Sequence, residues 1–342
     1  MSDNYNDLIK RLMIQDASSL TAHEKSLLQN NLDSFNRLAV MSNSELSSII
    51  QRDVTRSLWN GSEVLKKAQT AVRLIKALGI KWTFIDSPDF PPMLREMKDP
   101  PYALFYRGNL DCLNQKCVSI VGTRRVTCTG RNAAFDFAKD ASDDNVTVVS
   151  GLAMGVDICS HKGALAGKSG KTAAVLPGGI DTIVPLANTK TASKIIEKGG
   201  VLLSEYTPGT PAEKFRFVQR NRIIAALSPA TVVIQAPAGS GSMITAGLAL
   251  DYNRYVFFHQ VCFNSEAQMM DAYNTKDLEL KALQGKGSER IVRNKLLNSP
   301  KRFVEDGAPV IKDYADFVEQ FNSESVKPLK RENDGQMELF DI

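Results

Sequence analysis

Few cysteines occur in this sequence, and their spacing indicates neither a metal site nor a disulfide framework. The five cysteines are an odd number, form no C-x-x-C pair and lie mostly within apolar runs. We therefore expect buried free thiols, with neither zinc nor another cofactor. The cysteines are Cys112, Cys117, Cys128, Cys159 and Cys262.

Long apolar runs are also missing. No stretch approaches the roughly 18 uncharged apolar residues of a membrane-spanning helix, and the amino terminus MSDNYNDLIKRL has no apolar signal core. We therefore expect a cytoplasmic protein with no membrane partner. The charge is not one-sided either, because 42 basic residues stand against 38 acidic ones and give a net charge of +4. This balance is only a weak indication of a nucleic-acid partner, since such binding requires cations clustered on one face.

The sequence does contain ample apolar material for one large core. Its 342 residues are 43% hydrophobic and 23% charged, which is typical of a soluble globular chain with one large domain and smaller additions. Apolar residues at helical spacing predict a small helical domain over residues 1–80, with a last helix from Ser62 to Leu78 that stops at Gly79. Residues 82–108 are rich in proline, which forces extended or turn geometry, and indicate a wrapped connector. We expect the main domain to cover residues 81–320 and the polar tail 321–342 to be flexible.

Short runs rich in valine and isoleucine alternate with helical segments after the connector, at the spacing of parallel βαβ units. Each run is apolar on both faces, which is typical of strands covered by helices on both sides. The sequence therefore predicts a doubly wound α/β fold with a mainly parallel sheet. The predicted strands are residues 117–121, 146–149, 172–176, 201–203, 231–234 and 255–258, and residues 303–321 are predicted to add a final strand and helix.

Glycine, serine and arginine follow five of these strands. The carboxyl ends of parallel strands meet at one edge of a sheet, where open α/β folds bind their ligands, so we expect five loops to converge there. Glycine lets the backbone approach a ligand closely, and amides at a helix start carry partial positive charge, so the loops suit a phosphate. A tight turn explains any single loop equally well, but five together favour an anion site. The loops contain Gly122–Thr123–Arg124–Arg125, Ser150–Gly151–Leu152–Ala153, Pro177–Gly178–Gly179, Ser204–Glu205 and Gly239–Ser240–Gly241–Ser242.

Motifs that would indicate an enzyme are incomplete. Residues 163–169 resemble a Walker A loop, but they have three residues between the glycines instead of four and end a predicted helix. No G-x-G-x-x-G motif follows the first predicted strand, so the dinucleotide-binding fingerprint is absent. His161 is predicted to be a core or capping residue. The loop carboxylates Asp157, Asp181 and Glu205 lack the histidine or cysteine partner and spacing that hydrolysis requires.

A second group of residues with binding chemistry lies in the segment KFRFVQRNR, residues 214–222. Four cations alternate there with Phe215 and Phe217. Such an arrangement is expected where phosphates meet lysine or arginine while an unstacked base lies on an aromatic ring. In the alternative interpretation, the two phenylalanines pack in the core and the cations are solvated. Both interpretations stay open at this point.

In their order along the chain, these segments resemble the bacterial DNA-processing protein A family (DprA, also called Smf). The matching segments are FIDSPDFPPMLREMKDPPYALFYRGNL, SIVGTRR, VVSGLAMGVDICSHKGAL, KTAAVLPGGID, LLSEY, RNRIIAALS and SGSMITAGLAL. The resemblance implies an extended Rossmann-like domain that binds single-stranded DNA and loads the RecA recombinase during natural transformation and DNA recombination. It also implies a homodimer that catalyses no reaction.

The residues expected to contact DNA follow from the loops and from the resemblance. Position in the family's motifs implies that DNA is held by Arg124, Lys214, Phe217, Arg220, Asn221 and Arg222, with support from Ser240, Gly241 and Ser242. The loop argument adds Gly122, Thr123, Ser150 and Gly151 as phosphate-binding positions.

The tail suggests a separate partner. Residues 336–340, QMELF, resemble the Q-x-x-L-F peptide with which bacterial proteins dock on the DNA polymerase sliding clamp. Gln336, Leu339 and Phe340 would then contact a hydrophobic groove of the clamp.

Two alternative functions use the same sheet edge. The turn Pro177–Gly179 is similar to that of nucleotide phosphoribohydrolases of the cytokinin-activating family, but the spacing to their catalytic glutamate is lost here because Ile-Asp-Thr-Ile follows. The other alternative is a sensor that binds a nucleotide signal.

Overall fold

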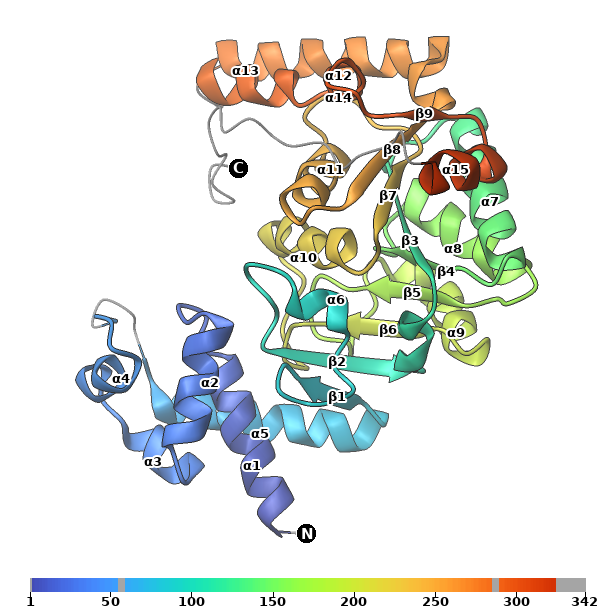
Figure 1. Cartoon of the computed structure of the whole chain (residues 1–342). Helices are drawn as coiled ribbons and strands as arrows, with labels where there is room; N and C mark the ends of the chain where they lie inside the picture. Colours follow the sequence, from blue (N-terminus) through green and yellow to red (C-terminus); the bar gives the residue numbers. More distant parts are fainter. Residues whose placement is uncertain (1, 55–58, 285–288, 324–342) are drawn as a thin grey trace. The chain divides into compact units, whose positions relative to one another are not determined.

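A computed structural model describes residues 2–54, 59–284 and 289–323 of the chain (Figure 1). Contacts between residues divide the chain into two units. Unit 1 consists of Met1–Arg107, Pro177–Thr182 and Leu203–Glu213, and unit 2 of Gly108–Leu176, Ile183–Leu202 and Lys214–Ile342. This division groups residues by space rather than by sequence, so the domain limits expected at residues 80 and 320 stay a prediction. The tail peptide with Gln336, Leu339 and Phe340 lies outside the described residues.

Unit 1 begins with the helices that the apolar spacing predicts. Thr21 starts the second helix with a reciprocal cap, in which its hydroxyl accepts a hydrogen bond from the Glu24 N–H and its own N–H donates to the Glu24 carboxylate. The fifth helix ends at Gly79, whose φ of 60° lies in the left-handed region that favours glycine. The helices are α1 Ser2–Gln15, α2 Ala22–Asn31, α3 Phe35–Val40, α4 Asn43–Ile50 and α5 Gly61–Leu78.

The proline-rich segment is more regular than its sequence indicates. It contains β1 Lys81–Phe84, α6 Pro92–Arg95 and β2 Ala103–Gly108, and the two strands pair antiparallel with Lys81 opposite Tyr106. The extended geometry expected within residues 82–108 is therefore present, and two extended segments pair as strands, which the sequence does not predict. The prolines lie between the strands, where no ladder hydrogen bond needs their missing N–H.

Unit 2 confirms the predicted alternation of strands and helices. All six predicted strands are present, and their ends differ from the prediction by one residue at most. Among the described residues, no helix combines the length and apolar composition that crossing a membrane requires. The elements are β3 Cys117–Val121, α7 Cys128–Asp143, β4 Thr147–Ser150, α8 Val156–Ala166, β5 Thr172–Val175, α9 Thr189–Glu197, β6 Val201–Ser204, α10 Lys214–Ala226, β7 Ala230–Val233, α11 Gly241–Asp251, β8 Tyr255–His259, α12 Ser265–Leu283, α13 Glu289–Leu297, α14 Pro300–Glu305, β9 Val310–Ile311 and α15 Tyr314–Asn322. The last two residues of β6 belong to unit 1.

The sheet of unit 2 changes direction at its centre. Its strands follow the order β5-β4-β3-β7-β8-β9, and every neighbouring pair is parallel. From β3 the chain moves outward through β4 to β5, and it later returns to the other side of β3 at β7 and continues to β8. The predicted doubly wound α/β fold is thus confirmed. Its topological switch point lies between β3 and β7, where folds of this kind bind ligands.

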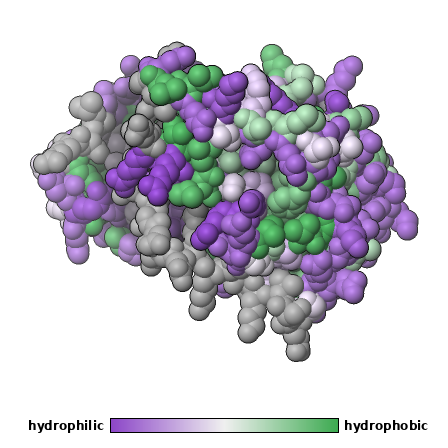
Figure 2. Space-filling view, turned by 90° about the horizontal axis from the view of Figure 1, so that it is seen from above, coloured by the Kyte–Doolittle hydropathy of each residue, from purple (hydrophilic) through white to green (hydrophobic). Residues whose placement is uncertain are grey.

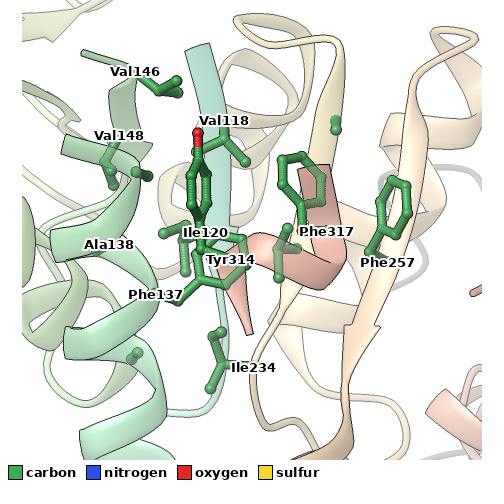
Figure 3. Close-up of a cluster of buried hydrophobic side chains, with 14 of the residues drawn as sticks. Val118, Ile120, Phe137, Ala138, Val146, Val148, Ile234, Phe257, Tyr314 and Phe317 are labelled. Atoms are coloured by element: carbon green, nitrogen blue, oxygen red, sulfur yellow. The ribbon is translucent and has the colours of Figure 1, made fainter. Parts of the chain in front are cut away.

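The middle strand β3 sends alternate side chains to opposite faces of the sheet. Val118 and Ile120 point into an apolar cluster with α7 and α15 (Figure 3). Ser119 lies between them and donates a hydrogen bond of 2.6 Å to the Ile224 carbonyl oxygen of α10. Helices therefore cover both faces of this strand, which explains why its sequence is apolar without alternation.

Aromatic rings attach the last helix, α15, to this core. The Phe317 ring meets those of Phe137 and Phe257 edge to face, with centroid distances of 5.6 and 5.0 Å. The Tyr314 hydroxyl donates to the Asp144 carboxylate at 2.8 Å. Residues 303–321 thus form the final strand and helix that the sequence predicts, and the helix is part of the core.

Three of the five cysteines are buried, namely Cys112, Cys117 and Cys262. Burial raises the pKa of each of these thiols to about 12, so they stay protonated and unreactive. The expectation of buried free thiols is confirmed for these three, whereas Cys128 is exposed at the start of α7 and Cys159 is half-buried.

Removal of the Phe317 ring tests how strongly α15 is held. We expect Phe317→Ala to lower the free energy of unfolding by about 3–5 kcal/mol, because the change leaves a cavity against two other rings. Urea unfolding measures the loss. Glu319→Ala, at an exposed position of the same helix, is the matched control and should stay within about 0.5 kcal/mol of the parent. Equal stability of the two variants would contradict this description of the core.

Candidate functional site

A cavity of about 470 Å³ opens at the switch point of the sheet. Its walls come from the loop after β3, the start of α8, one face of α10, the loop between β7 and α11, and α12. Nine residues predicted from the sequence line it: Gly122, Thr123, Arg124, Phe217, Arg220, Asn221, Ser240, Gly241 and Ser242. The structure thus brings most of the predicted residues together in one cavity.

The loop after β3 is held by the end of β7. The Thr123 N–H donates to the Gln235 carbonyl oxygen at 2.7 Å, and the fully buried Gln235 side chain accepts from the Thr127 N–H at 3.0 Å and donates to its hydroxyl at 3.1 Å. Gly122 is packed so closely that a Cβ atom there would overlap Val156. This fixed backbone carries the exposed side chains of Arg124 and Arg125 at the cavity.

Arg124 lies over the ring of Phe217, with its guanidinium carbon 4.9 Å from the ring centroid. A cation–π contact of this kind is worth about 0.5–1 kcal/mol when exposed. Phe217 is half-buried, whereas Phe215 is 55% exposed and Lys214 is exposed. Neither phenylalanine is therefore a fully buried core residue, and the alternative interpretation of the segment does not describe this structure.

The neighbouring cations behave differently, because α10 is a continuous helix from Lys214 to Ala226. Arg220 and Arg222 are only 3% and 6% exposed. One Nη of Arg220 donates to the Gly151 carbonyl oxygen at 2.8 Å and also bonds to that of Val175. The expectation that Arg220, Asn221 and Arg222 together present donors to a ligand needs correction, since successive helical residues point about 100° apart.

The loop after β4 lines the cavity through Ala153, whereas its first two residues lie beneath the cavity. Ser150 is fully buried and donates to the Ile120 carbonyl oxygen at 2.7 Å, and Gly151 packs against the guanidinium of Arg220. Ser150 and Gly151 therefore shape the site from below. Neither residue lines the cavity, so the direct ligand contact expected of them stays a prediction.

His161 fixes the same loop from the other side. The Thr172 hydroxyl donates to the Val148 carbonyl oxygen at 2.6 Å, so it accepts from His161 Nδ1–H at 2.7 Å. Nε2 is then free to accept from the Leu152 N–H at 3.3 Å, and Leu152 is held in the left-handed region with φ 56°. The histidine is a neutral core residue, as the sequence predicts, and burial lowers its pKa to about 3.

The loop between β7 and α11 is clamped through Ala238 and Gly239. The Ala238 N–H donates to the Asp271 carboxylate at 2.7 Å, and the Asn274 amide donates to the Ala238 carbonyl oxygen at 2.8 Å. The Gly239 N–H donates to the Asn298 carbonyl oxygen at 2.8 Å. The helix start at Gly241 is thereby aimed at the cavity, and its first N–H groups have no partner within the helix.

Ser240 precedes this helix and leaves a polar atom unsatisfied. Its Oγ is buried and has no hydrogen-bond partner among the described residues, and it does not cap α11. The Asn221 amide donates to the Gly241 carbonyl oxygen at 3.2 Å, which ties α10 to the same loop. A ligand in the cavity would find the hydroxyl of Ser240 and the amides of α11 on one side.

Asp157 is a buried carboxyl in the wall of the cavity. Burial raises its pKa, against the lowering effects of Arg220, of the Ala153 N–H and of Arg124. Neither histidine nor cysteine occurs among the residues that line the cavity. The arrangement offers cations, amides and an aromatic ring, which suit the binding of an anion with an aromatic part.

Two of the five predicted loops do not line the cavity. Pro177–Gly179 and Ser204–Glu205 belong to unit 1. There the Ser204 hydroxyl donates to the Gly178 carbonyl oxygen at 2.6 Å, and the Gln15 amide donates to the Glu205 carbonyl oxygen at 2.7 Å. The expectation that all five loops converge therefore stays a prediction for these two, which belong to a different unit from the cavity.

Sequence reasoning missed the contribution of α12. Met270, Tyr273, Asn274 and Asp277 all line the cavity. They lie in a polar stretch whose apolar spacing is too weak to predict a packed face. Gln235 was also missed, since one glutamine at the end of an apolar strand carries no signal in the sequence.

The pH dependence of stability tests the neutral state of His161. An unfolded histidine binds a proton near pH 6.5 and folded His161 only near pH 3, so the folded state loses stability as pH falls through this window. We expect the loss from this residue to be about 2 kcal/mol between pH 7 and pH 5. Urea unfolding of the parent and of His161→Asn at both pH values measures it. His23→Asn, at an exposed position of α2, is the control. The same pH difference in the parent and His161→Asn would contradict the assignment.

Comparison with known proteins agrees with the fold and the motifs. A sequence model of the family "DNA recombination-mediator protein A" matches residues 81–322, from the first residue of β1 to the last of α15. The chain is 31% identical to protein Smf of Borreliella burgdorferi over 255 residues, which are 75% of this chain and 80% of that protein. It is 38% identical to DNA processing protein DprA of Bacillus subtilis over 180 residues, which are 52% of this chain and 60% of that protein.

A solved structure has the same fold. The crystal structure of DNA processing protein A from Streptococcus pneumoniae is similar with a TM-score of 0.64 and 25% sequence identity, and the match covers 91% of this chain and 97% of that one. The extended Rossmann-like fold implied by the sequence motifs is thereby confirmed. The chain belongs to the DNA recombination-mediator protein A family, the DNA-processing proteins called DprA or Smf.

Proposed function

We propose that the cavity binds single-stranded DNA and that the chain is a recombination mediator, which brings this DNA to the RecA recombinase, and not an enzyme. The observation that carries the proposal is the pair of exposed arginines, Arg124 and Arg125, held on a fixed loop beside the Phe217 ring at the switch point of the sheet. Cations beside an aromatic ring suit a chain of phosphates whose bases are unpaired.

The exposed residues take the direct contacts in this proposal. Arg124 and Arg125 bind phosphates, and Phe217 supports the guanidinium of Arg124 from behind. Lys214 is exposed at the start of α10, one turn before Phe217, and adds a cation where the strand leaves the cavity. Asn221, one turn after Phe217, offers its amide.

Ser240, Gly241 and Ser242 bind a phosphate through the start of α11. The unsatisfied Oγ of Ser240 supports this assignment, because a buried hydroxyl without a partner costs free energy that a ligand can recover. The backbone amides of Gly241 and Ser242 lie at the positive end of the helix dipole. Gly122 and Thr123 complete the phosphate site with backbone, since a side chain at Gly122 would not fit.

The buried residues act indirectly. Arg220 and Arg222 hold α10 in place, and Ser150 and Gly151 support the loop that Arg220 contacts. The proposal of a binding protein rather than an enzyme is supported by the lining of the cavity, in which no histidine or cysteine accompanies the carboxyl groups of Asp157 and Asp277.

We further propose three functional parts. Residues 1–80 form a helical domain, residues 81–320 the DNA-binding domain, and residues 321–342 a tether with a clamp-binding peptide. The chain works in the cytoplasm, where its DNA and RecA are present, and as a homodimer. These proposals rest on the family to which the chain belongs and on its sequence motifs.

Loss of a phosphate-binding cation tests the assignment of the site. We expect Arg124→Ala to weaken binding of a fluorescently labelled thymidine 20-mer by about tenfold at low salt, since a charge-assisted hydrogen bond is lost. The slope of log affinity against log salt should fall by about 0.7 for each phosphate contact removed. Fluorescence anisotropy at two or more salt concentrations measures both quantities.

Two further variants make this test specific. Lys214→Ala should weaken binding in the same direction, whereas Lys190→Ala, at an exposed position of α9 that does not line the cavity, should bind like the parent. Unchanged affinity in both Arg124→Ala and Lys214→Ala would refute the site. A parent protein that prefers duplex to single strands would refute the proposed substrate.

The tail peptide is tested independently of DNA binding. We expect the full chain to retain the sliding clamp in a pull-down, and the variant Leu339→Ala, Phe340→Ala to lose it, because the two apolar anchors fill the groove of the clamp. The variant should still bind single-stranded DNA like the parent. Equal recovery of clamp by both proteins would remove the clamp from the list of partners.

A further inference from the structure

The cavity has a second wall whose chemistry differs from that of the first. α12 contributes Met270, Tyr273, Asn274 and Asp277 to the lining. Tyr273 is 68% exposed, which is a high fraction for a large aromatic side chain. Figure 2, seen from above relative to Figure 1, shows hydrophobic residues grouped between hydrophilic ones on this face of the molecule. In the cavity, Met270 and Tyr273 give the α12 wall apolar and aromatic side chains, whereas the loop after β3 presents cations.

Hydrogen bonds hold Tyr273 in position from both sides. Asp271 accepts from the Ala238 N–H at 2.7 Å, and the Asn274 amide donates to the Ala238 carbonyl oxygen at 2.8 Å. Both polar groups of one loop residue are therefore bonded to the turn of helix that carries Tyr273. Ala267, one turn earlier, is buried, and Glu266 accepts from the Thr129 hydroxyl at the start of α7. The tyrosine is exposed but its backbone is fixed.

Charge separates the two walls. Arg124 and Arg125 are exposed on the first wall, whereas the charged residue that α12 adds to the lining is Asp277, which pairs with Lys281 at 2.5 Å. None of the lining residues that α12 contributes is a cation, and a phosphate near this helix would face the carboxylate of Asp277. Bases carry no charge and have a π-face, so α12 favours the base side of a nucleotide strand and disfavours the phosphate side.

We propose that α12 forms the base-binding wall of the DNA groove and that Tyr273 is a platform on which an unpaired base stacks. This inference rests on the proposed function. The strand lies with its phosphates toward Arg124 and Arg125 and with a base toward Tyr273 and Met270. Such an orientation selects single strands, because the bases of a duplex are paired and stacked inside and present no face to a side chain.

Substitution of the ring tests the platform. Tyr273→Ala is expected to weaken binding of a thymidine 20-mer by roughly tenfold, the range of one base–aromatic stack. Tyr273→Phe keeps the π-face and should bind within about twofold of the parent. Met269→Ala is the matched control, because Met269 is 66% exposed on the same helix but does not line the cavity, and it should also bind like the parent.

Abasic DNA separates stacking from charge. Against an abasic strand of the same length, Tyr273→Ala and the parent should bind equally, since the partner of the ring has been removed. The salt dependence of Tyr273→Ala should match that of the parent, because no phosphate contact is lost, whereas Arg124→Ala should change it. Circular dichroism of each variant should match that of the parent, which shows that the total helix content is unchanged.

The outcomes distinguish this inference from the function on which it rests. If the parent does not bind single strands, the proposed function fails. If the parent binds and Arg124→Ala is impaired but Tyr273→Ala binds like the parent, the function stands and the base-binding wall is overturned. If Tyr273→Ala loses affinity equally for thymidine and abasic strands, the residue has only a structural role and the platform is likewise overturned.

Discussion

A buried guanidinium is the interaction on which the site depends. Arg220 lies inside unit 2 and bonds to the carbonyl oxygens of Gly151 and Val175, where β4 and β5 end. A charge removed from water is tolerated only when its donors are satisfied, so these bonds fix the rotation of α10 about its axis. With Arg220 turned inward, Phe217 and Asn221 reach the cavity. The loop after β4 is shaped by the same bonds.

Rigid backbone and exposed side chains have separate tasks in this arrangement. Gln235, His161 and the polar groups around Ala238 use their hydrogen bonds to fix three loops. The side chains that remain at the surface, above all Arg124, are then presented without a large loss of backbone freedom on binding. Such a division suits a protein that binds DNA strands of many different sequences, because phosphate charge and base stacking depend little on base identity.

The sequence predicts the sheet well because each predicted strand is apolar on both faces and five of the six are followed by a loop with glycine or serine. It predicts the site less well. A run such as Arg220–Asn221–Arg222 contains no sign that helical geometry buries its two cations and leaves only the middle residue partly exposed. The sequence does not predict that Tyr273 lines the cavity for another reason. Long-range hydrogen bonds to Ala238 place α12 beside the cavity, and the spacing of apolar residues carries no information on such bonds. The strands β1 and β2 were not predicted because the segment that contains them is rich in proline.

Hydrogen exchange of the full chain, with and without a single-stranded oligonucleotide, tests the central claim most directly, because it locates the bound strand without any substitution. We predict slower exchange in the loop after β3, at residues 239–242 and in the first half of α12, with little change in α9. Protection confined to segments outside these walls, or none at saturating oligonucleotide, would contradict the account.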